Sequence, residues 1–373
     1  AALGVSHLYL SPIAAAVPGS THGYDGIDPA RINPELGGEA GFRQLAEVTR
    51  AHGMGLILDI VPNHLAASPH SQWWSDVLMH GPRSPHAAWF DIEWEAPGCE
   101  GRLWLPVLDR PLHDAVRDGV VRVVVDNARP VLRHHGLALP LSPRSHPLEP
   151  AQWPAWAERC NRSVERLHTL LQRQHYRLAW WRTAGDQVNY RRFFDINELA
   201  ALRVEREDVF EAVHALPLRL VREGWVDGLR IDHVDGLSCP GAYLQRLRES
   251  LDAACAAGGR DPQTVSLHVE KILAEGEQLP DGWACDGTTG YDFMDQAGAW
   301  LHDPAAAPAL SRTWQALGGD PRSFDRIQQD ARAMLLRQGL HADFQRLLRS
   351  AQQVLQPRLA EADIGVAALA RAL

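Results

Sequence analysis

The sequence has few cysteines, no excess of basic residues and no long apolar run, and each absence excludes a class of protein. Its five cysteines are scattered through 373 residues without CxxC spacing, which argues against a disulfide framework and against a zinc site. Asp and Glu (46) outnumber Lys and Arg (37), so the net charge is −9 and no basic stripe is available for nucleic acid. No apolar stretch approaches the length of a membrane span, so we expect no signal peptide and no membrane partner. The scattered cysteines favour a reducing cytoplasm as the compartment.

What the sequence does contain is typical of a soluble globular protein. Apolar residues make up 45% of the chain and charged residues 22%, and a chain of this length can form one large barrel domain or two ordinary domains. Most of the 13 tryptophans lie between Trp73 and Trp181. Tryptophan rings can stack on sugars, but ordinary packing explains most of them.

Both ends of the sequence suggest a fragment of a longer protein. Residues 1–4 resemble the end of a helix, and residues 364–373 form an apolar-periodic segment without a stop signal. We therefore expect further segments on either side.

The N-terminal part of the sequence predicts a parallel β-sheet. Residues 5–10 form a short apolar run that ends at Ser11-Pro12, as in a buried strand. Residues 39–52 have the apolar spacing of a helix, and Gly53 follows at the position of a C-capping glycine. Residues 55–61 form a second apolar run. Strand, helix and strand with short connections are the βαβ unit of a parallel sheet.

The alternation of strands and helices stops near residue 65 and resumes near residue 188. The segment between is rich in Pro, Trp and His, with a β-like piece at 120–125 and one helix at 154–171, and we interpret it as a subdomain inserted into a strand-to-helix loop. Beyond it the pattern predicts a helix at 208–223, a strand at 225–231, a helix at 241–257, a strand at 264–270, a strand or loop at 283–291, and helices at 308–317, 323–338 and 341–355.

These patterns divide the chain into four predicted segments. Residues 1–64 are the first part of a barrel, 65–187 the inserted Trp-rich subdomain, 188–292 the second part of the barrel, and 293–373 a helical subdomain.

The predicted strand at 225–231 ends in charged residues. Arg230 and Asp232 are two residues apart, so their side chains lie on the same side of the strand. A guanidinium at that place is expected to keep Asp232 ionised and oriented. An oriented carboxylate at the carboxyl end of a barrel strand suits a glycosidase nucleophile. A structural ion pair that closes the strand is the alternative interpretation, and this pattern alone does not separate the two.

Other polar residues follow the neighbouring predicted strands. Asp59 lies near the tip of the strand at 55–61 with His64 just beyond it, and Glu270 ends the strand at 264–270. Tyr24 and Asp25 follow the first strand. Active sites of α/β barrels are assembled from such strand ends, so these distant positions can converge on one pocket.

The ordered set of motifs resembles the α-amylase clan of glycoside hydrolases and transferases. The motifs are D-x-x-x-N-H at 59–64, G-x-R-x-D at 228–232 and then the strand-ending Glu270. Within the clan the sequence is similar to the family of maltooligosyl trehalose synthases, through the segments 20–25, 33–38, 191–199, 227–237 and 287–293. The resemblance implies an α/β fold, a (β/α)8 TIM barrel, here incomplete because the first strand and the last strands are missing.

The resemblance also implies a role for each matching residue. Asp232 would be the nucleophile and Glu270 the general acid/base, with the two carboxyls roughly 5 Å apart as retention at an anomeric carbon requires. Arg230 would orient Asp232 in the substrate-binding site. The other implied roles are a hydrogen bond from His64 to the attacked glucose, a stacking platform from Tyr24 under it, a position for His233 facing the next glucose, and hydrogen bonds from Asp25 and Asp59 to the residues that touch substrate.

The activity implied is an intramolecular transglucosylation that needs no cofactor. The reducing-end α-1,4 bond of a maltooligosaccharide would become an α,α-1,1 bond, which leaves a trehalose unit at the end of the glucan. No metal is expected: Asn63 matches a calcium-binding position of many amylases, but no cluster of acidic ligands accompanies it, so a loop-fixing side chain is the preferred interpretation. The sequence does not specify an oligomeric state.

The sequence departs from the family at one important point. The clan uses a third carboxylate, an Asp that follows a His on a later strand, and no such pair follows Tyr291 at a strand tip. His302-Asp303 is the literal match, but it lies at the end of a predicted helix and we reject it. The isolated chain is therefore expected to have unpaired sheet edges and an incomplete site, and to be inactive alone.

Two alternatives remain beside the synthase. A general α-glucan hydrolase or transferase of the same clan would release free reducing ends, whereas the synthase would make a non-reducing product. A catalytically incomplete glucan-binding fragment would bind saccharide even after Asp232 or Glu270 is changed. The presence of both carboxyls argues against it, because binding alone does not require the pair.

Overall fold

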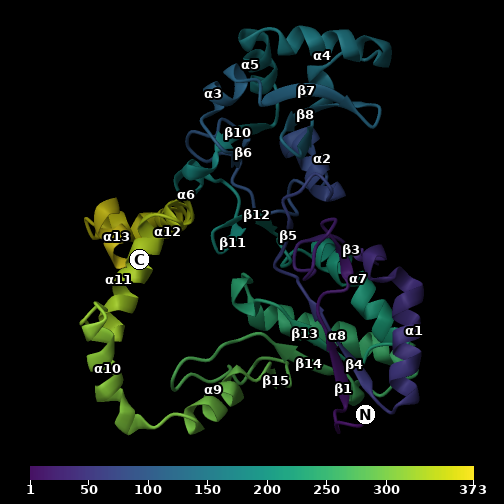
Figure 1. Ribbon diagram of the computed structural model, residues 1–373, viewed down its shortest axis with the longest axis vertical. Helices are drawn as coiled ribbons and strands as arrows, with labels where there is room; N and C mark the ends of the chain where they lie inside the picture. Colours follow the sequence, from purple (N-terminus) through teal and green to yellow (C-terminus); the bar gives the residue numbers. More distant parts are fainter. The chain divides into compact units, whose positions relative to one another are not determined.

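The computed structural model describes residues 1–356, 358–359 and 362–373, and the chain falls into two compact units. Unit 1 consists of Ala1–Gln72 and Glu198–Pro321, and unit 2 of Trp73–Asn197 and Arg322–Leu373. In Figure 1 unit 1 combines the purple N-terminal part of the chain with the green segments. In the part of the chain that the structure describes, no helix combines the length and hydrophobicity needed to cross a membrane.

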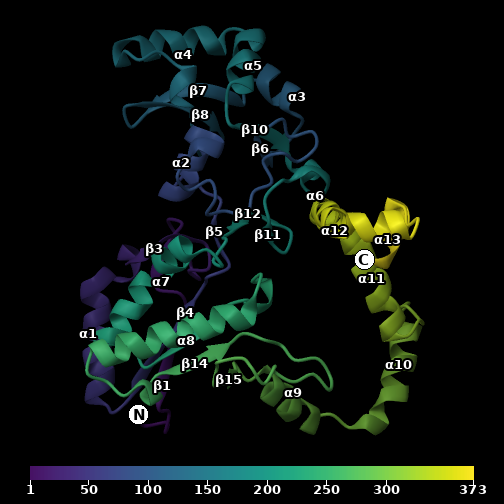
Figure 2. The ribbon, with the colours of Figure 1, turned by 180° about the vertical axis from the view of Figure 1, so that it is seen from behind.

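Unit 1 is built on a five-stranded parallel sheet. Its strands lie in the order β1 (His7–Leu10), β4 (Gly55–Ile60), β13 (Gly228–Ile231), β14 (Ser266–Val269) and β15 (Gly287–Thr288). Figure 2 labels β1, β4, β14 and β15 of this sheet from behind. The four predicted strands are confirmed as β1, β4, β13 and β14, each slightly shorter than its apolar run. The predicted strand or loop at 283–291 contains β15.

Three helices cover one face of this sheet. They are α1 (Gly38–Ala51), α7 (Glu207–Arg222) and α8 (Pro240–Ala257), which confirm three predicted helices. Their buried apolar residues form one cluster with the strand residues Leu56, Leu58, Leu229, Ile231, Leu267 and Val269. These strand residues alternate with the polar ones, so the helices all lie against the same face. A parallel sheet with its helices on one face is the arrangement of a barrel wall, whereas a doubly wound sheet has helices on both faces.

Short antiparallel pairs lead into and out of this sheet. Strand β2 (Ala14–Ala16) pairs with β3 (Gly26–Ile32). Strand β5 (His64–Ala66) pairs with the end of β12 (Ile196–Ala201), with His64 opposite Ala201. Helices α9 (Tyr291–Trp300) and α10 (Ala307–Ala316) follow the sheet.

Unit 2 contains the Trp-rich segment as a mixed α/β body. Its strands are a parallel pair, β6 (Leu103–Leu108) with β10 (Tyr176–Trp180), and an antiparallel meander of β7 (Val121–Asp126), β8 (Arg129–His134) and β9 (Leu137–Pro140), with β11 (Arg192–Phe193) after them. Its helices include α2 (Gln72–His80), α3 (Leu112–Arg117), α4 (Trp153–Asn161), α5 (Val164–Gln172) and α6 (Ala184–Gln187). The predicted single helix at 154–171 is wrong: Ser163 is extended and its side chain accepts a hydrogen bond from the Arg166 N–H, which starts a second helix.

The C-terminal helices of unit 2 pack on the inserted segment. They are α11 (Phe324–Arg337), α12 (His341–Glu361) and α13 (Val366–Ala372). The buried Arg192 lies 3.2 Å from the carboxylate of Asp343, and Arg349 forms a bidentate pair with Glu93. The sequence pattern suggested a separate helical segment over 293–373, whereas these contacts join 322–373 to 73–197. As domain boundaries the four predicted ranges stay a prediction.

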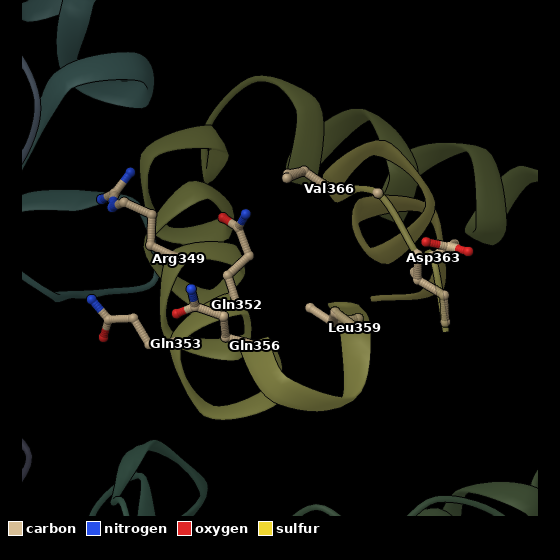
Figure 3. A pocket seen from close by; sticks show the side chains of 9 residues that line it. Arg349, Gln352, Gln353, Gln356, Leu359, Asp363 and Val366 are labelled. Carbon is tan, nitrogen blue, oxygen red and sulfur yellow. The ribbon is translucent and has the colours of Figure 1, made fainter. Parts of the chain in front are cut away.

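One cavity of unit 2 lies between α12 and the segment that leads into α13. It has a volume of about 660 Å³ and is lined by polar side chains of α12, among them Arg349, Gln352, Gln353 and Gln356 (Figure 3). None of the residues predicted for the catalytic site lines it.

Candidate active site

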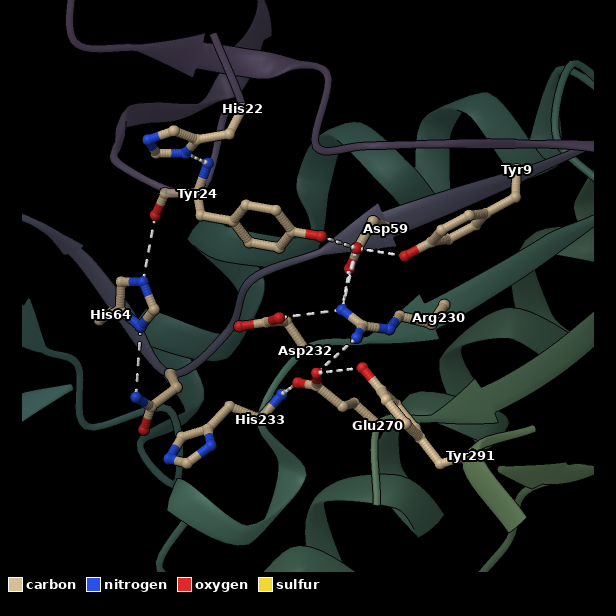
Figure 4. Close-up of polar contacts among 11 residues, drawn as sticks. Tyr9, His22, Tyr24, Asp59, His64, Arg230, Asp232, His233, Glu270 and Tyr291 are labelled. Atoms are coloured by element: carbon tan, nitrogen blue, oxygen red, sulfur yellow. Dashed lines mark hydrogen bonds and ion pairs between the residues drawn. The ribbon is translucent and has the colours of Figure 1, made fainter. Parts of the chain in front are cut away.

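The polar face of the sheet in unit 1 ends in a cluster of charged residues at the carboxyl ends of β4, β13 and β14. Register places Asp59 of β4 beside Arg230 of β13. Asp232 and Glu270 directly follow β13 and β14, and their N–H groups extend the ladder, to the Ile60 carbonyl at 2.9 Å and the Ile231 carbonyl at 2.8 Å. The structure therefore brings both predicted catalytic carboxylates to neighbouring strand tips, as Figure 4 shows.

Arg230 is the centre of this cluster. Its Nη1 donates to both oxygens of Asp59, at 2.8 and 2.9 Å, and to Oδ1 of Asp232 at 2.9 Å. Its Nη2 lies 2.8 Å from Oε1 of Glu270. One buried guanidinium thus binds three carboxylates, and it holds Asp232 and Glu270 at its two terminal nitrogens.

Three carboxylates around one guanidinium leave the cluster with an excess of negative charge. Burial, with the charges of Glu270 and Asp59, raises the pKa of Asp232 to about 7 against the opposing effect of Arg230. Arg230 lowers the pKa of Asp232, as expected, but burial and two like charges outweigh one guanidinium, so the pKa lies above the usual range of an aspartate. Burial also raises the pKa of Asp59, although hydrogen bonds from Tyr24 and Tyr9 and the charge of Arg230 oppose it. Close like charges do not all ionise, so the cluster favours keeping one proton near neutrality.

Two tyrosines bind the far side of Asp59. The hydroxyl of Tyr24 donates to Oδ2 at 2.6 Å, and the hydroxyl of Tyr9 donates to the same oxygen. Burial and the Asp59 carboxylate raise the pKa of both tyrosines, so they stay donors. Sequence reasoning missed Tyr9. The available signal was its place between Leu8 and Leu10, which puts its side chain on the polar face of the sheet.

Glu270 is bound by a turn that follows β13. His233 has a left-handed backbone (φ 49°), and its N–H donates to Oε2 of Glu270 at 2.8 Å. Gly236 closes this turn, and a Cβ there would overlap the His233 ring and lie 2.7 Å from the Asn63 side-chain oxygen. A substitution at Gly236 would therefore displace the turn that positions Glu270. The predicted contact of the His233 ring with a second glucose stays a prediction.

Tyr291 lies in the family-like segment 287–293, and its sequence pattern does not mark it as a site residue. Its hydroxyl lies 3.5 Å from Oε1 of Glu270, the oxygen that Arg230 also binds. It enters the cluster from the start of α9, directly after Gly290.

His64 is buried, with polar atoms at both ring nitrogens. Nε2 lies 3.1 Å from the Tyr24 carbonyl oxygen, and Nδ1 lies 3.3 Å from the Asn63 side-chain nitrogen. Since a carbonyl only accepts, the arrangement favours a proton on Nε2 and an acceptor Nδ1. The ring thereby fixes the loop that carries Tyr24, and the predicted hydrogen bond to glucose stays a prediction.

Asp25 and Asp303 form hydrogen bonds within their own loops. Ser20 donates to Asp25, and the Val17 N–H donates to the Asp25 carbonyl at 3.1 Å, so this residue shapes its own loop. Asp303, rejected above, accepts from the Ala305 N–H at 2.9 Å and caps the next helical turn.

The sequence is similar to known proteins over most of its length. The family model for the alpha-amylase catalytic domain matches residues 1–266. A Mycobacterium tuberculosis protein with the provisional name maltooligosyl trehalose synthase is 41% identical over 349 residues, which cover 93% of this chain and 40% of that protein. An intracellular maltogenic amylase of Bacillus subtilis is 41% identical over only 91 residues, 24% of this chain and 15% of that protein.

Solved structures give a similar result. A maltooligosyltrehalose synthase from Arthrobacter ramosus matches with a TM-score of 0.77 and 37% identity, over 93% of this chain and 41% of that one. A structure titled DSM5389 glycosyltrehalose synthase matches with a TM-score of 0.79 and 33% identity, over 95% and 45% of the two chains. These likenesses confirm the resemblance predicted from the motifs. The chain spans about two fifths of the length of these relatives.

Proposed function

The chain belongs to the alpha-amylase family, and from that premise we propose that its full-length protein converts maltooligosaccharides to maltooligosyl trehalose. The reaction is an intramolecular transglucosylation, in which the reducing-end α-1,4 bond becomes an α,α-1,1 bond. The extent of the likeness supports this choice over an amylase, because it covers 93% of the chain for the synthases and 24% for the maltogenic amylase.

One observation carries the proposal. Asp232 and Glu270 end adjacent strands and are bound by the two terminal nitrogens of the same guanidinium. A retaining mechanism needs such a pair of close carboxyls, one to attack the anomeric carbon and one to protonate the leaving oxygen.

The proposed steps use this pair in turn. Asp232 attacks the anomeric carbon as a carboxylate while Glu270 gives its proton to the departing oxygen. The freed reducing-end glucose stays bound and turns, and its own anomeric hydroxyl attacks the glycosyl-enzyme as Glu270 takes the proton back. Water has to be excluded while the glucose turns, because otherwise hydrolysis would follow.

The fold of the full protein is part of the proposal. We infer that the five strands are consecutive members of a (β/α)8 barrel whose first and last strands lie outside this sequence. The helices on one face and the length of the relatives support this. The third carboxylate of the family would come from one of those strands, so residues 1–373 alone would be inactive.

The test is product analysis with the full-length protein. Incubation with maltopentaose is expected to yield a non-reducing pentasaccharide, seen as loss of reducing ends without loss of mass. Free reducing ends with shorter products would instead indicate a hydrolase, and binding without turnover would indicate a glucan-binding protein.

Two variants test whether the Glu270 carboxyl takes part in this reaction. Glu270→Gln is expected to slow product formation by about 10²- to 10⁴-fold, the usual contribution of general acid/base catalysis. Glu275→Gln, an exposed residue of the following loop, is the control and should retain full activity.

A further inference from the structure

Two histidines and one aspartate in unit 2 converge at the edge of the β7–β9 meander and take no part in the proposed reaction. Asp109 follows β6, His134 ends β8, and His135 begins the turn to β9. Each offers one side-chain ligand atom, and the three atoms lie within 4.8 Å of one another.

The local backbone brings these side chains to one side. Successive residues of a strand normally point to opposite faces, but His135 has a left-handed backbone with φ 49°. The two imidazole rings consequently lie 4.3 Å apart between centroids. Their Nε2 atoms face the two oxygens of Asp109, His134 at 3.8 Å from Oδ1 and His135 at 3.7 Å from Oδ2.

This donor set selects a class of metal ion. Two imidazole nitrogens and one carboxylate oxygen suit Zn²⁺ and neighbouring divalent transition metals, whereas Ca²⁺ needs six to eight oxygens. Ligand atoms about 2.1 Å from a tetrahedral zinc are roughly 3.4 Å apart, whereas the three ligand atoms here lie within 4.8 Å of one another, so the side chains need to close by up to about 1.4 Å. We propose that Asp109, His134 and His135 bind Zn²⁺ or a similar divalent transition metal, with water completing its coordination.

Two of the three ligands are held in place by other parts of unit 2. His134 is 5% exposed. The indole N–H of Trp180, at the end of β10, donates to the Asp109 carbonyl at 3.0 Å. A bound ion would therefore tie the turn between β8 and β9 to the end of β6.

Arg110 competes with the metal for Asp109. Its Nε and Nη2 donate to the two Asp109 oxygens at 3.2 and 2.9 Å. Both side chains are solvent-exposed, and such a pair contributes so little that displacing it costs at most about fivefold in affinity. Arg110 also keeps a second partner, the Asp118 carboxylate at 3.1 Å. Removing Arg110 should consequently tighten metal binding, an effect that random surface binding would not show.

The experiment is calorimetric titration of residues 1–373, purified without a histidine tag, with ZnCl₂ and separately with CaCl₂. One zinc per chain and no heat from calcium are expected. His135→Ala should weaken zinc binding at least tenfold, and Arg110→Ala should strengthen it by up to about fivefold. The control is His113→Ala, which disrupts another histidine pair of unit 2, stacked on His168 at 6.0 Å, and should bind as the unchanged chain does.

Circular dichroism and thermal unfolding without metal establish that each variant is folded. The proposal is wrong if the unchanged chain binds no zinc, if His113→Ala weakens binding as much as His135→Ala does, or if Arg110→Ala has no effect or weakens binding. Because the readout is metal binding, the result is independent of the proposed transglucosylation.

Discussion

The two faces of the parallel sheet in unit 1 differ in chemistry although the same strands form both. The residues toward the helices are apolar and buried, for example Leu58, Leu229 and Val269. The alternate residues on the other face include Tyr9, Asp59 and Arg230, and Tyr9 remains 52% exposed. The first face stabilises the sheet through burial, whereas the second concentrates charge at the cost of stability. The difference shows that one strand can serve packing and chemistry through its alternating side chains.

The largest expected effect is on activity when the polar face loses its proposed nucleophile. In the full-length protein, Asp232→Asn should lower kcat by at least about 10⁴-fold, as removal of a nucleophile does in other enzymes. The measurement is the initial rate of non-reducing product from maltopentaose. Asp281→Asn, at an exposed position, is the control. A comparable loss of kcat in this variant would contradict the assignment of Asp232 as the nucleophile.

A substitution on the helix-facing side should affect stability alone. Leu229 is fully buried, so Leu229→Ala is expected to lower the free energy of unfolding by about 2–5 kcal/mol through lost burial and a cavity. Denaturant unfolding measures this change, and kcat per folded molecule should stay unchanged. Leu301→Ala, at a residue 86% exposed, should change stability by less than about 0.5 kcal/mol. Equal effects of the two substitutions would contradict the account of this face.

The charged residues of the polar face should make the free energy of unfolding depend on pH. Because the pKa of Asp232 is raised to about 7, the folded protein binds more protons than the unfolded chain between about pH 4 and pH 7. Stability from this group is therefore present at low pH and decreases as the pH rises to 7. Asp232→Asn removes the buried charge, so it should stabilise the protein at pH 8 by on the order of 2 kcal/mol.

Denaturant midpoints at pH 4.5, 6 and 8 check this prediction. The gain from Asp232→Asn should shrink toward pH 4.5, and Asp281→Asn should show no such trend. A gain that is equal at all three pH values would show that Asp232 is not the group responsible.

The smallest expected effect concerns the tyrosine that the sequence analysis missed. Tyr9→Phe removes one donor to Asp59 while Tyr24 continues to bind the same oxygen. We expect a loss of about tenfold or less in kcat, with little change in KM, because Asp59 reaches the proposed nucleophile through Arg230. The control is Tyr176→Phe, whose hydroxyl donates to the Pro140 carbonyl in unit 2. A loss in kcat that is no larger for Tyr9→Phe than for this control would exclude a positioning role.

The main elements of the sheet could be predicted from the sequence because apolar runs and strand-ending charges are local signals. The runs at 55–61 and 264–270 correspond to β4 and β14. Asp232 and Glu270 directly follow β13 and β14, at the strand ends where they were predicted. The raised pKa of Asp232 could not be predicted in the same way. It depends on how many carboxylates share Arg230 and how deeply they are buried, and both are properties of the folded cluster.

Other parts depend on contacts that leave little trace in the sequence. The place of Tyr9 between Leu8 and Leu10 puts it on the polar face of the sheet, but neither its segment nor that of Tyr291 shows which carboxylate the hydroxyl reaches. The break between α4 and α5 was readable in principle from Ser163, an N-capping residue followed by apolar helical spacing.

The proposal that Asp232 attacks the sugar is tested most directly by trapping the glycosyl-enzyme. The full-length protein would be incubated with an activated fluoroglucoside that forms a slowly reacting adduct, then digested and sequenced by mass spectrometry. The account predicts one glucosyl adduct on the peptide carrying Asp232, and none in Asp232→Asn. An adduct on Glu270, or on a carboxylate outside the cluster bound by Arg230, would contradict it.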